Sequence, residues 1–468
     1  MSKSASDYAP VFILAVSDSL CAQTSASRDS RVEVVVFNRS TQRIEPREHI
    51  TAFRTHPPEP GRRALATEFV GCSAARIPVQ KRTDQTVDQY GNLTSTSVYD
   101  WGSGAPGALL RTYTHSYLTN ANYLSRYVRN RLVQSTVTGG GQTVTLALNE
   151  YDNNGNLGSS CGVQAPAGAL REHDPAYDTT NQMYRGNLTK RTECGAATTF
   201  GYDFGGNRLC ATLPNGTTVT SGFGSSTNYS APGTITAGTL TSSIQWSPSL
   251  VPTSETGPNG DSSSVLADLY GRPSQTTSAT GAVTTYTYAS AAPWTVTATT
   301  NGRWVKKTLD GFGRTVKQES GYASTVVSVV ETEYAPCACS PMGKVKRTTM
   351  PRKATGGQVW TTNTYDALGR TTRVTAPDST YKQYDYAGNM LKVTDEAGKW
   401  KKYWTDGNGN LTRVEEPRAT GDTLQTSDYV TTYTYDVLNH LTQSVMTRGD
   451  GGNAVTQTRT FNYGTPPG

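Results

Sequence analysis

The sequence is poor in the residues that build a large hydrophobic core. Of its 468 residues only 35% are hydrophobic, Leu and Ile are scarce, and no run of 18 apolar residues occurs. The last absence excludes a transmembrane helix, which needs roughly 20 apolar residues to cross a bilayer. The apolar material is mainly Val, Tyr and the methyl groups of Thr, accompanied by 45 Gly. Such residues suit half-buried strands joined by many turns, so the composition predicts an all-β chain.

The chain also has little charge and no clear export signal. Charged residues make up 17% of the sequence and the net charge is +6, which does not require a nucleic-acid partner. The short apolar stretch 11–16 follows Pro10 and meets Asp18 almost at once. It is too short for the hydrophobic part of a signal peptide. We therefore expect no nucleic-acid partner and find no clear signal peptide.

Histidine and cysteine are too few and too scattered to predict a reactive or metal-binding centre. The five histidines stand in no motif with a nucleophile, and they are His49, His56, His115, His173 and His440. The seven cysteines have irregular spacing, which does not indicate a disulfide framework, and they are Cys21, Cys72, Cys161, Cys194, Cys210, Cys337 and Cys339. Cys337 and Cys339 could face one side of a strand, but two ligands do not make a zinc site. We expect no cofactor, no metal site and no enzyme activity.

One motif recurs along most of the chain: Asp-x-x-Gly followed by Asn or Arg. Its aspartates are Asp88, Asp152, Asp203, Asp268, Asp310, Asp366, Asp385 and Asp406, and its glycines are Gly91, Gly155, Gly206, Gly271, Gly313, Gly369, Gly388 and Gly409. A ninth copy begins at Asp436 and has Asn439 in place of the glycine. The stretch around Gly186 keeps the second half of the motif without the aspartate. Repetition on this scale indicates a repeat protein.

The spacing of the motif is typical of a turn between two antiparallel strands. An aspartate at the first position of a turn accepts backbone hydrogen bonds, and a glycine three residues later takes the left-handed conformation that ends the turn. Asn439 fits this interpretation, because Asn tolerates that conformation best after Gly. Alternating Tyr and Thr precede the turns, as in residues 431–436, and a second, proline-containing turn type follows, as at Pro377. The motif residues are therefore predicted to be structural.

With its Tyr-Asp-x-x-Gly-Asn/Arg units, the sequence resembles the RHS, or YD-repeat, family of bacterial surface and toxin-delivery proteins. The resemblance covers roughly residues 81–463, and the Cys-x-Cys-Ser-Pro segment within 334–351 also looks like one found between repeats. The resemblance implies a long antiparallel sheet of hairpins that curls into a spiral or shell. In larger relatives that shell encloses a C-terminal toxin. This chain shows no matching C-terminal core segment, so we expect it to be a fragment or a repeat array alone.

The motifs also have chemical interpretations, none of which the sequence favours over a structural one. Calcium needs six to eight oxygens, usually from several carboxylates, and each turn offers one aspartate. The glycine-rich residues 203–208 lack the context of a phosphate loop. In residues 399–404, Trp400 and Trp404 alternate with basic residues, which could form a sugar-stacking surface. Trp404 stands one place out of register with the tyrosines of the sibling turns, so either a bulge returns it to the core or it is exposed, and core packing is the favoured interpretation.

The sequence thus predicts an all-β fold of antiparallel β-hairpin repeats that form one long curved or spiral sheet. We expect a non-repeat segment over residues 1–80 and a repeat region over 81–468. The predicted function is a non-enzymatic structural or interaction module of a cell-surface or secreted bacterial shell or scaffold. Its expected partners are an encapsulated polypeptide or a cell-surface glycan. The alternatives are a carbohydrate-binding repeat protein and, less favoured, a glycan-cleaving enzyme, whose paired carboxylates would be defined by space rather than by sequence.

Overall fold

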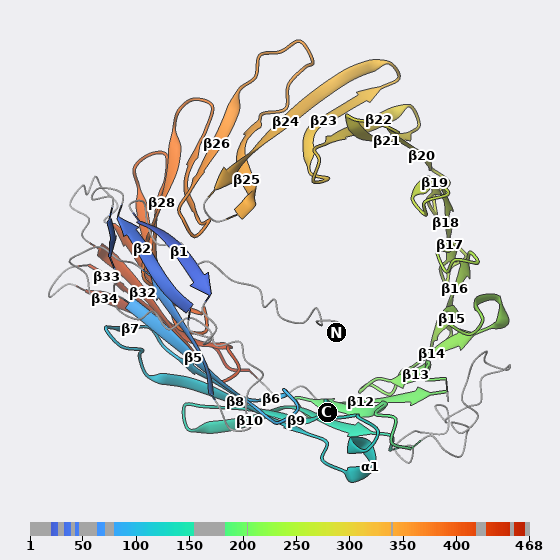
Figure 1. The fold of residues 1–468 in the computed structure, drawn as a ribbon, viewed down its shortest axis with the longest axis horizontal. Coiled ribbons are helices and arrows are strands. Elements are labelled where there is room, and N and C mark those ends of the chain that lie inside the picture. Colours follow the sequence, from blue (N-terminus) through green and yellow to red (C-terminus); the bar gives the residue numbers. More distant parts are fainter. Residues whose placement is uncertain are drawn as a thin grey trace, which may run out of the picture.

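The computed structural model of this chain is a ring made from one long, curved antiparallel sheet (Figure 1). Strands account for 61% of the structure and helices for 2%, and the sheet has 30 strands. The structure describes residues 79–153, 183–203, 205–337, 340–417, 427–449 and 454–463, together with four strands before them. The predicted all-β fold with one curved sheet of hairpin repeats is confirmed.

Most of the elements from β5 onwards follow one another with short connections. The first strands are β1 Leu20–Ala26, β2 Val32–Asn38, β3 Arg43–Glu45, β4 Arg63–Val70, β5 Val79–Val87, β6 Leu93–Tyr99, β7 Gly102–Ser103, β8 Leu109–Tyr117, β9 Leu132–Gly139 and β10 Gln142–Tyr151, with α1 Ala121–Leu124 between β8 and β9. The next are β11 Leu188–Glu193, β12 Ala196–Tyr202, β13 Arg208–Thr212, β14 Thr218–Phe223, β15 Pro232–Ala237, β16 Leu240–Trp246, β17 Pro252–Thr256, β18 Ser262–Ala267, β19 Pro273–Thr277, β20 Val283–Tyr288, β21 Trp294–Thr300 and β22 Arg303–Leu309, with the 3₁₀ helix η2 Ser225–Thr227 before β15. The last are β23 Thr315–Tyr322, β24 Thr325–Cys337, β25 Ser340–Thr349, β26 Trp360–Tyr365, β27 Thr371–Thr375, β28 Tyr381–Ala387, β29 Met390–Thr394, β30 Trp400–Thr405, β31 Leu411–Pro417, β32 Ser427–Tyr435, β33 Leu441–Arg448 and β34 Val455–Thr460.

The strands form because their sequences alternate residues that favour a pleated, half-buried surface. Strand β20 reads VTTYTY, and its residues alternate between exposed and half-buried. Side chains of successive strand residues point to opposite faces, so the tyrosines of β20 line one face of the sheet. The β-branched threonines suit the same pleated geometry.

Neighbouring strands in the sheet are nearly always neighbours in the sequence. From β8 to β34 each strand pairs antiparallel with the next, and β4, β5, β6 and β8 continue the same order at the other end. Strand β7 makes an additional pairing with β5, and β1–β3 form a separate three-stranded sheet. The registers of the described strands pair β34 with β33 and β4 with β5, and the long sheet is not closed.

The two ends of the ring meet through turns and side chains where β5–β9 lie beside the last hairpins (Figure 1). The Trp101 indole donates to the carbonyl of Asp406 at 3.2 Å. The backbone N–H of Gly407 donates to the carboxylate of Asp100 at 2.8 Å. The Nη2 of Arg111 donates to the carbonyl of Asp436, also at 2.8 Å. We call this region, β5–β9 with β28–β33, the overlap.

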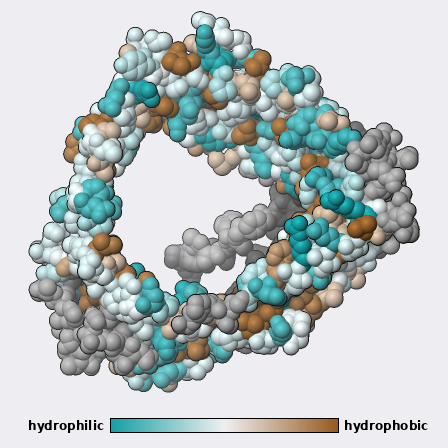
Figure 2. Space-filling model, turned by 180° about the vertical axis from the view of Figure 1, so that it is seen from behind, coloured by the Kyte–Doolittle hydropathy of each residue, from teal (hydrophilic) through white to brown (hydrophobic). Residues whose placement is uncertain are grey.

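The ring is hollow and thin, and Figure 2 shows the open centre from behind. Its accessible surface is 30188 Å², whereas a compact protein of this mass, 50.3 kDa, would expose about 17,000 Å². No helix in the described part of the chain is long and apolar enough to cross a membrane. In a long part of the ring, from Pro232 to Ser328, every residue is exposed or half-buried, as expected for strands without a second covering layer.

Candidate functional site

The repeated turn is the most frequent constellation in the molecule, and Asp366 shows its geometry. The Asp366 N–H donates to the carbonyl of Arg370 and the Gly369 N–H donates to the carbonyl of Asp366. One carboxylate oxygen of Asp366 accepts the N–H groups of Leu368 and Arg370 at 3.0 and 2.8 Å. Gly369 has φ +77°, the left-handed conformation that glycine adopts without a steric penalty. The carboxylate therefore holds the backbone of the turn.

The same two backbone hydrogen bonds occur at most of the predicted turn positions. They are present at Asp88, Asp203, Asp268, Asp310, Asp406 and Asp436. The fourth residue has positive φ at Gly91, Gly206, Gly271, Gly313, Gly409 and Asn439. The proline-containing turns share this backbone geometry, as the positive φ of Ser379 and of Gly216 shows. The two turn types that the sequence suggests are thus one backbone turn with two side-chain versions.

The residue after the glycine has a role that the sequence reasoning missed. At Asp366 the second carboxylate oxygen accepts the Arg370 Nε at 2.7 Å. At Asp406 an asparagine does the same, with Asn410 Nδ2 at 3.0 Å from the carboxylate. Both side chains supply a donor beside the aspartate, which accounts for the Asn or Arg after these turns and for His440 after the turn at Asp436. The signal was present in the sequence as a restricted choice at that position.

Arginine and asparagine connect each turn to the next repeat in different ways. Arg272, Arg314 and Arg370 each place the guanidinium 4.1 Å from the ring centroid of a tyrosine on a following strand, at Tyr288, Tyr334 and Tyr386. Asparagine instead uses its second N–H. Asn92 donates to the carbonyl of Arg129 at 2.7 Å, and Asn207 donates to the carbonyl of Tyr229 at 3.0 Å. Cation–π contacts and hydrogen bonds thus join turn to turn.

Tyrosines before the turns form a second connection between repeats. Each donates its hydroxyl to a backbone carbonyl of an earlier strand: Tyr117 to Leu93, Tyr151 to Leu132, Tyr365 to Val345 and Tyr435 to Leu411, at 2.7 to 3.0 Å. Burial raises the pKa of the Tyr117 and Tyr435 hydroxyls, and the carboxylates of Asp88 and Asp406 raise it further. The hydroxyls therefore stay protonated and keep donating at neutral pH.

Asp385 differs from the prediction that it begins a turn. It lies inside β28, opposite Lys392 of β29, and the chain reverses through Gly388 and Asn389. Gly388 has φ +62°, and the closest strand pair is Ala387 with Met390. In a two-residue hairpin of this kind, the paired strands continue up to the residues next to the loop, here Ala387 and Met390. Asp385 therefore lies within the strand and not in the turn. Conversely, Asp395 and Gly398 form the common turn, although Lys399 follows them.

The copy at Asp152 is divided in two. The Asp152 carboxylate accepts the N–H groups of Gly186 and Asn187 at 2.7 and 3.0 Å, and its own N–H donates to the carbonyl of Asn187. It therefore completes the half-motif around Gly186, which lacks its own aspartate. The predicted partner Gly155 lies outside the described residues. The buried carboxylate also accepts the hydroxyl of Tyr123 at 2.8 Å, so α1 is attached to this split turn.

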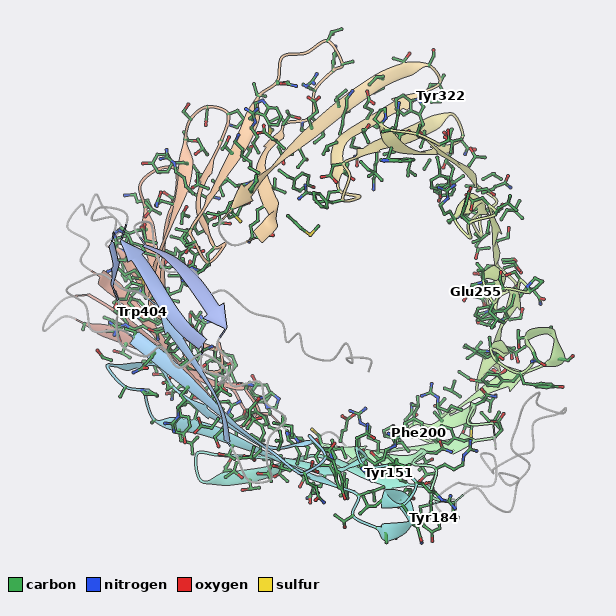
Figure 3. All side chains as sticks on the ribbon, viewed as in Figure 1. Tyr151, Tyr184, Phe200, Glu255, Tyr322 and Trp404 are labelled. Carbon is green, nitrogen blue, oxygen red and sulfur yellow. The ribbon has the colours of Figure 1, made fainter. Side chains whose placement is uncertain are left out.

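The two tryptophans proposed for sugar stacking occupy different surroundings. Trp400 is only 2% exposed, and the ammonium groups of Lys402 and Lys392 lie 4.7 and 5.8 Å from its ring centroid. Trp404 is half-buried, and the guanidinium of Arg413 lies 5.4 Å from its ring centroid. Figure 3 shows Trp404 within the wall of the ring. Trp400 offers no open face to a sugar.

A cleft of about 620 Å³ lies next to Trp400. Its lining includes Tyr403, Tyr429 and Arg448, and the Lys401 ammonium pairs there with Glu416 at 2.5 Å. The hydrogen bond to Glu416 raises the pKa of Lys401. Lys401 and Glu416 neutralise each other, and the other charged side chains that line the cleft, beside its aromatic surface, are Asp395, Lys399 and Arg448.

Metal and thiol chemistry receive little support in the described part of the chain. That part contains no group of three His, Cys, Asp or Glu side chains placed to hold a metal ion. Cys210 and Cys337 are disulfide-bonded, and Cys194 is free and exposed. The carboxylates of the turns are already occupied by N–H donors, which leaves them poorly placed to bind calcium.

Comparison with protein families matches the RHS Repeat to residues 365–399. This stretch contains the turns at Asp366 and Asp395 and the short hairpin at Gly388. The chain therefore carries an RHS repeat, and the resemblance inferred from the Tyr-Asp motif is confirmed. No curated protein matches the sequence.

Similar solved structures include Tc toxin assemblies. The crystal structure of TcdB2-TccC3-TEV is 13% identical over 92% of this chain and 24% of that chain, with a TM-score of 0.34. A Tc holotoxin pore from Photorhabdus luminescens is 12% identical over 85% of this chain and 31% of that chain, with a TM-score of 0.26. A porin-like protein from Bacteroides uniformis is 14% identical over 47% of this chain, with a TM-score of 0.16, and the match covers 87% of that protein. The chain spans about a quarter of the length of the first toxin chain.

Proposed function

We propose that the chain is a non-enzymatic structural module, a section of an RHS-repeat shell or scaffold that surrounds a polypeptide. The observation that carries this proposal is the hollow single-layer ring, whose surface of 30188 Å² is far larger than a compact protein of its mass would expose. Such a wall encloses much space with few residues. The repeat turns support the same function, because their carboxylates are used to hold the backbone.

The free edge of the sheet also suits a scaffold. Strand β34 pairs with β33, and all six of its residues are exposed. Its outer backbone groups are therefore available for an additional strand. We propose that further strands, from this protein or from a partner, extend the wall at this edge.

We further propose that the protein acts outside a bacterial cell, at its surface or after secretion, and that its cargo is a toxin-like polypeptide. This part of the proposal comes from the RHS repeat and the sequence resemblance. The carbohydrate-binding alternative that used Trp400 and Trp404 is less favoured, because Trp400 is buried. A glycan-cleaving activity is also not favoured, because Glu416 in the cleft beside Trp400 is paired with Lys401.

Purification of the native protein from its bacterium would test the function. We expect an antibody against the ring to recover it from the surface or medium fraction, together with a polypeptide that resists protease until the shell is denatured. Mass spectrometry would show whether that polypeptide is covalently continuous with the ring. Recovery from the cytoplasm alone, with no protected polypeptide, would contradict the proposal.

A further inference from the structure

A pocket beside α1 contains side chains that the shell proposal does not use. It has a volume of about 440 Å³ and is lined by Gln89, Tyr90, Asn92, Tyr127, Arg129 and Asn130. The first three belong to the turn at Asp88, and the last three follow α1. The two loops are joined by the hydrogen bond from Asn92 to the carbonyl of Arg129 at 2.7 Å. The pocket is therefore formed by two fixed turns.

Arg129 is held in position without a carboxylate. Its guanidinium lies 4.8 Å from the ring centroid of Tyr90 and 4.8 Å from that of Tyr127. No acidic side chain among the described residues forms an ion pair with it, and its buried Nε has no hydrogen-bond partner there. At the turns of Arg272, Arg314 and Arg370 the arginine pairs with its own aspartate. At the turn of Asp88, the side chain that donates to the carboxylate is Asn92, whose Nδ2 lies 2.8 Å from the Asp88 Oδ2.

The ring of Tyr127 projects into solvent because of an unusual backbone conformation. Tyr127 has φ +61° and is 79% exposed. A bulky residue seldom adopts this conformation, and it persists only where the surroundings impose it. Here the N–H of Tyr127 donates to the carbonyl of Leu124 and the N–H of Val128 donates to that of Tyr123. The end of α1 thus fixes the ring beside Arg129.

The loop that supplies Tyr127, Arg129 and Asn130 follows directly after α1. Figure 1 places α1 on the outer side of the wall, and Figure 3 shows Tyr184, which packs against Tyr123 of α1, on the same side.

We infer that this pocket binds a small ligand with one carboxylate and a hydroxylated ring, namely an acidic monosaccharide. A guanidinium recognises a carboxylate through two parallel hydrogen bonds. Gln89 and Asn130 offer amide donors and acceptors for hydroxyl groups, and the tyrosine rings offer surfaces for the C–H face of a sugar. The volume lies in the usual range for small-molecule sites. A phosphate group would be expected to meet more than one cation, and the pocket has a single one.

Calorimetric titration of the full chain with methyl glucuronide and with methyl glucoside would test the inference. We expect the glucuronide to bind about tenfold more tightly than the neutral sugar, because only it pairs with Arg129. Arg129→Gln should remove that difference. Arg303→Gln, which deletes the same charge at an exposed position on β22, should preserve it.

A second pair of variants separates binding from folding. Tyr127→Gly removes the ring but suits the positive φ, so the loop should remain folded while glucuronide affinity falls several-fold. Tyr127→Phe should keep most of the affinity. Equal binding of the two sugars, unchanged glucuronide binding in both Arg129→Gln and Tyr127→Gly, or inorganic phosphate binding as tightly as the glucuronide would each overturn the assignment. These results would leave the shell proposal unaffected, because that proposal makes no use of the pocket.

Discussion

The arc from β15 to β23 and the overlap of β5–β9 with β28–β33 are made from the same hairpin unit, yet they differ in burial. Between Pro232 and Ser328 no residue is buried, and Leu269 and Tyr270 of the turn at Asp268 are 101% and 83% exposed. In the overlap, Val137, Trp400 and Arg111 are 1%, 2% and 6% exposed. The hairpin unit can therefore make a strand ladder without burying a residue, as in the arc, whereas the overlap buries large side chains such as Trp400.

This difference separates two sources of stability. In the arc, the strands are held by ladder hydrogen bonds, by the turn carboxylates of Asp268 and Asp310 and by the hydroxyl of Tyr288, all of which connect near neighbours, as expected for a repeat protein. In the overlap, residues more than 300 positions apart meet. Closing such a long loop costs entropy, and buried contacts must offset that cost. Four predictions test this division.

The largest effect is expected from removing the buried indole of the overlap. Trp400→Ala should lower the free energy of unfolding by about 3–5 kcal/mol, because it removes a fully buried aromatic side chain and leaves a cavity. The matched change in the arc is Trp294→Ala, where the side chain is 47% exposed. It should cost about 1 kcal/mol or less. Urea denaturation of both variants measures the difference, and equal losses would remove the distinction between the regions.

A smaller effect is expected from two glycines at the same turn position. A Cβ on Gly407 would lie 2.4 Å from the carbonyl oxygen of Tyr99, whereas a Cβ on Gly311 would meet nothing within 4 Å. Gly407→Ala should therefore destabilise by about 1–3 kcal/mol and loosen the overlap. Gly311→Ala should be neutral or slightly stabilising. Thermal unfolding with small-angle scattering would show both effects, and an unchanged ring in Gly407→Ala would mean that the two ends do not pack as described.

The next comparison concerns two aspartates with the same sequence motif. Asp366→Asn weakens a carboxylate that accepts Leu368, Arg370 and the arginine side chain, so it should cost about 1–2 kcal/mol. Asp385→Asn changes a strand residue whose carboxylate accepts the Gln383 amide at 3.2 Å. It should change stability by less than about 0.5 kcal/mol. Chemical denaturation of both variants would measure the two losses of stability. Equal losses would show that Asp385 also holds a turn.

The smallest effect per residue is expected from pH. Desolvation raises the pKa of the Asp268 and Asp310 carboxyls, but hydrogen bonds from Arg272 and Arg314 outweigh it and the pKa of each is lowered. The unfolded pKa is about 3.9. A lowered folded pKa means that the stabilisation is present above about pH 4 and is lost as the pH falls through the folded value.

The control for this prediction keeps the turns but removes the titration. A variant with Asp268→Asn and Asp310→Asn should show a shallower fall in stability below about pH 4 than the unaltered protein. Added salt should reduce the contribution of these exposed arc carboxylates. Circular dichroism during acid titration would measure the loss of folded protein in both the variant and the unaltered protein. An identical acid profile in the variant would show that these turns contribute nothing to acid stability.

Much of the repeat could be predicted from particular residues. The turns at Asp88, Asp310 and Asp366 follow from local chemistry, because an aspartate and a left-handed glycine three positions apart define the backbone path. Asp385 could not be distinguished from them, because the same Asp-x-x-Gly-Asn sequence is compatible with both a two-residue hairpin and the longer turn. The link between Asp152 and Gly186 also escaped prediction, because an insertion separates residues that are adjacent in space.

The sequence by itself determined the strands, the turns and the RHS-type repeat, because each depends on interactions within or between neighbouring hairpins. The tertiary structure alone decided which tryptophan is buried, where Arg129 is left without an acid, and how Trp101 meets Asp406. The physical reason is that a small curvature added at every hairpin accumulates around the ring. No local sequence pattern determines the total curvature, and only the folded chain brings the two ends of the sheet together.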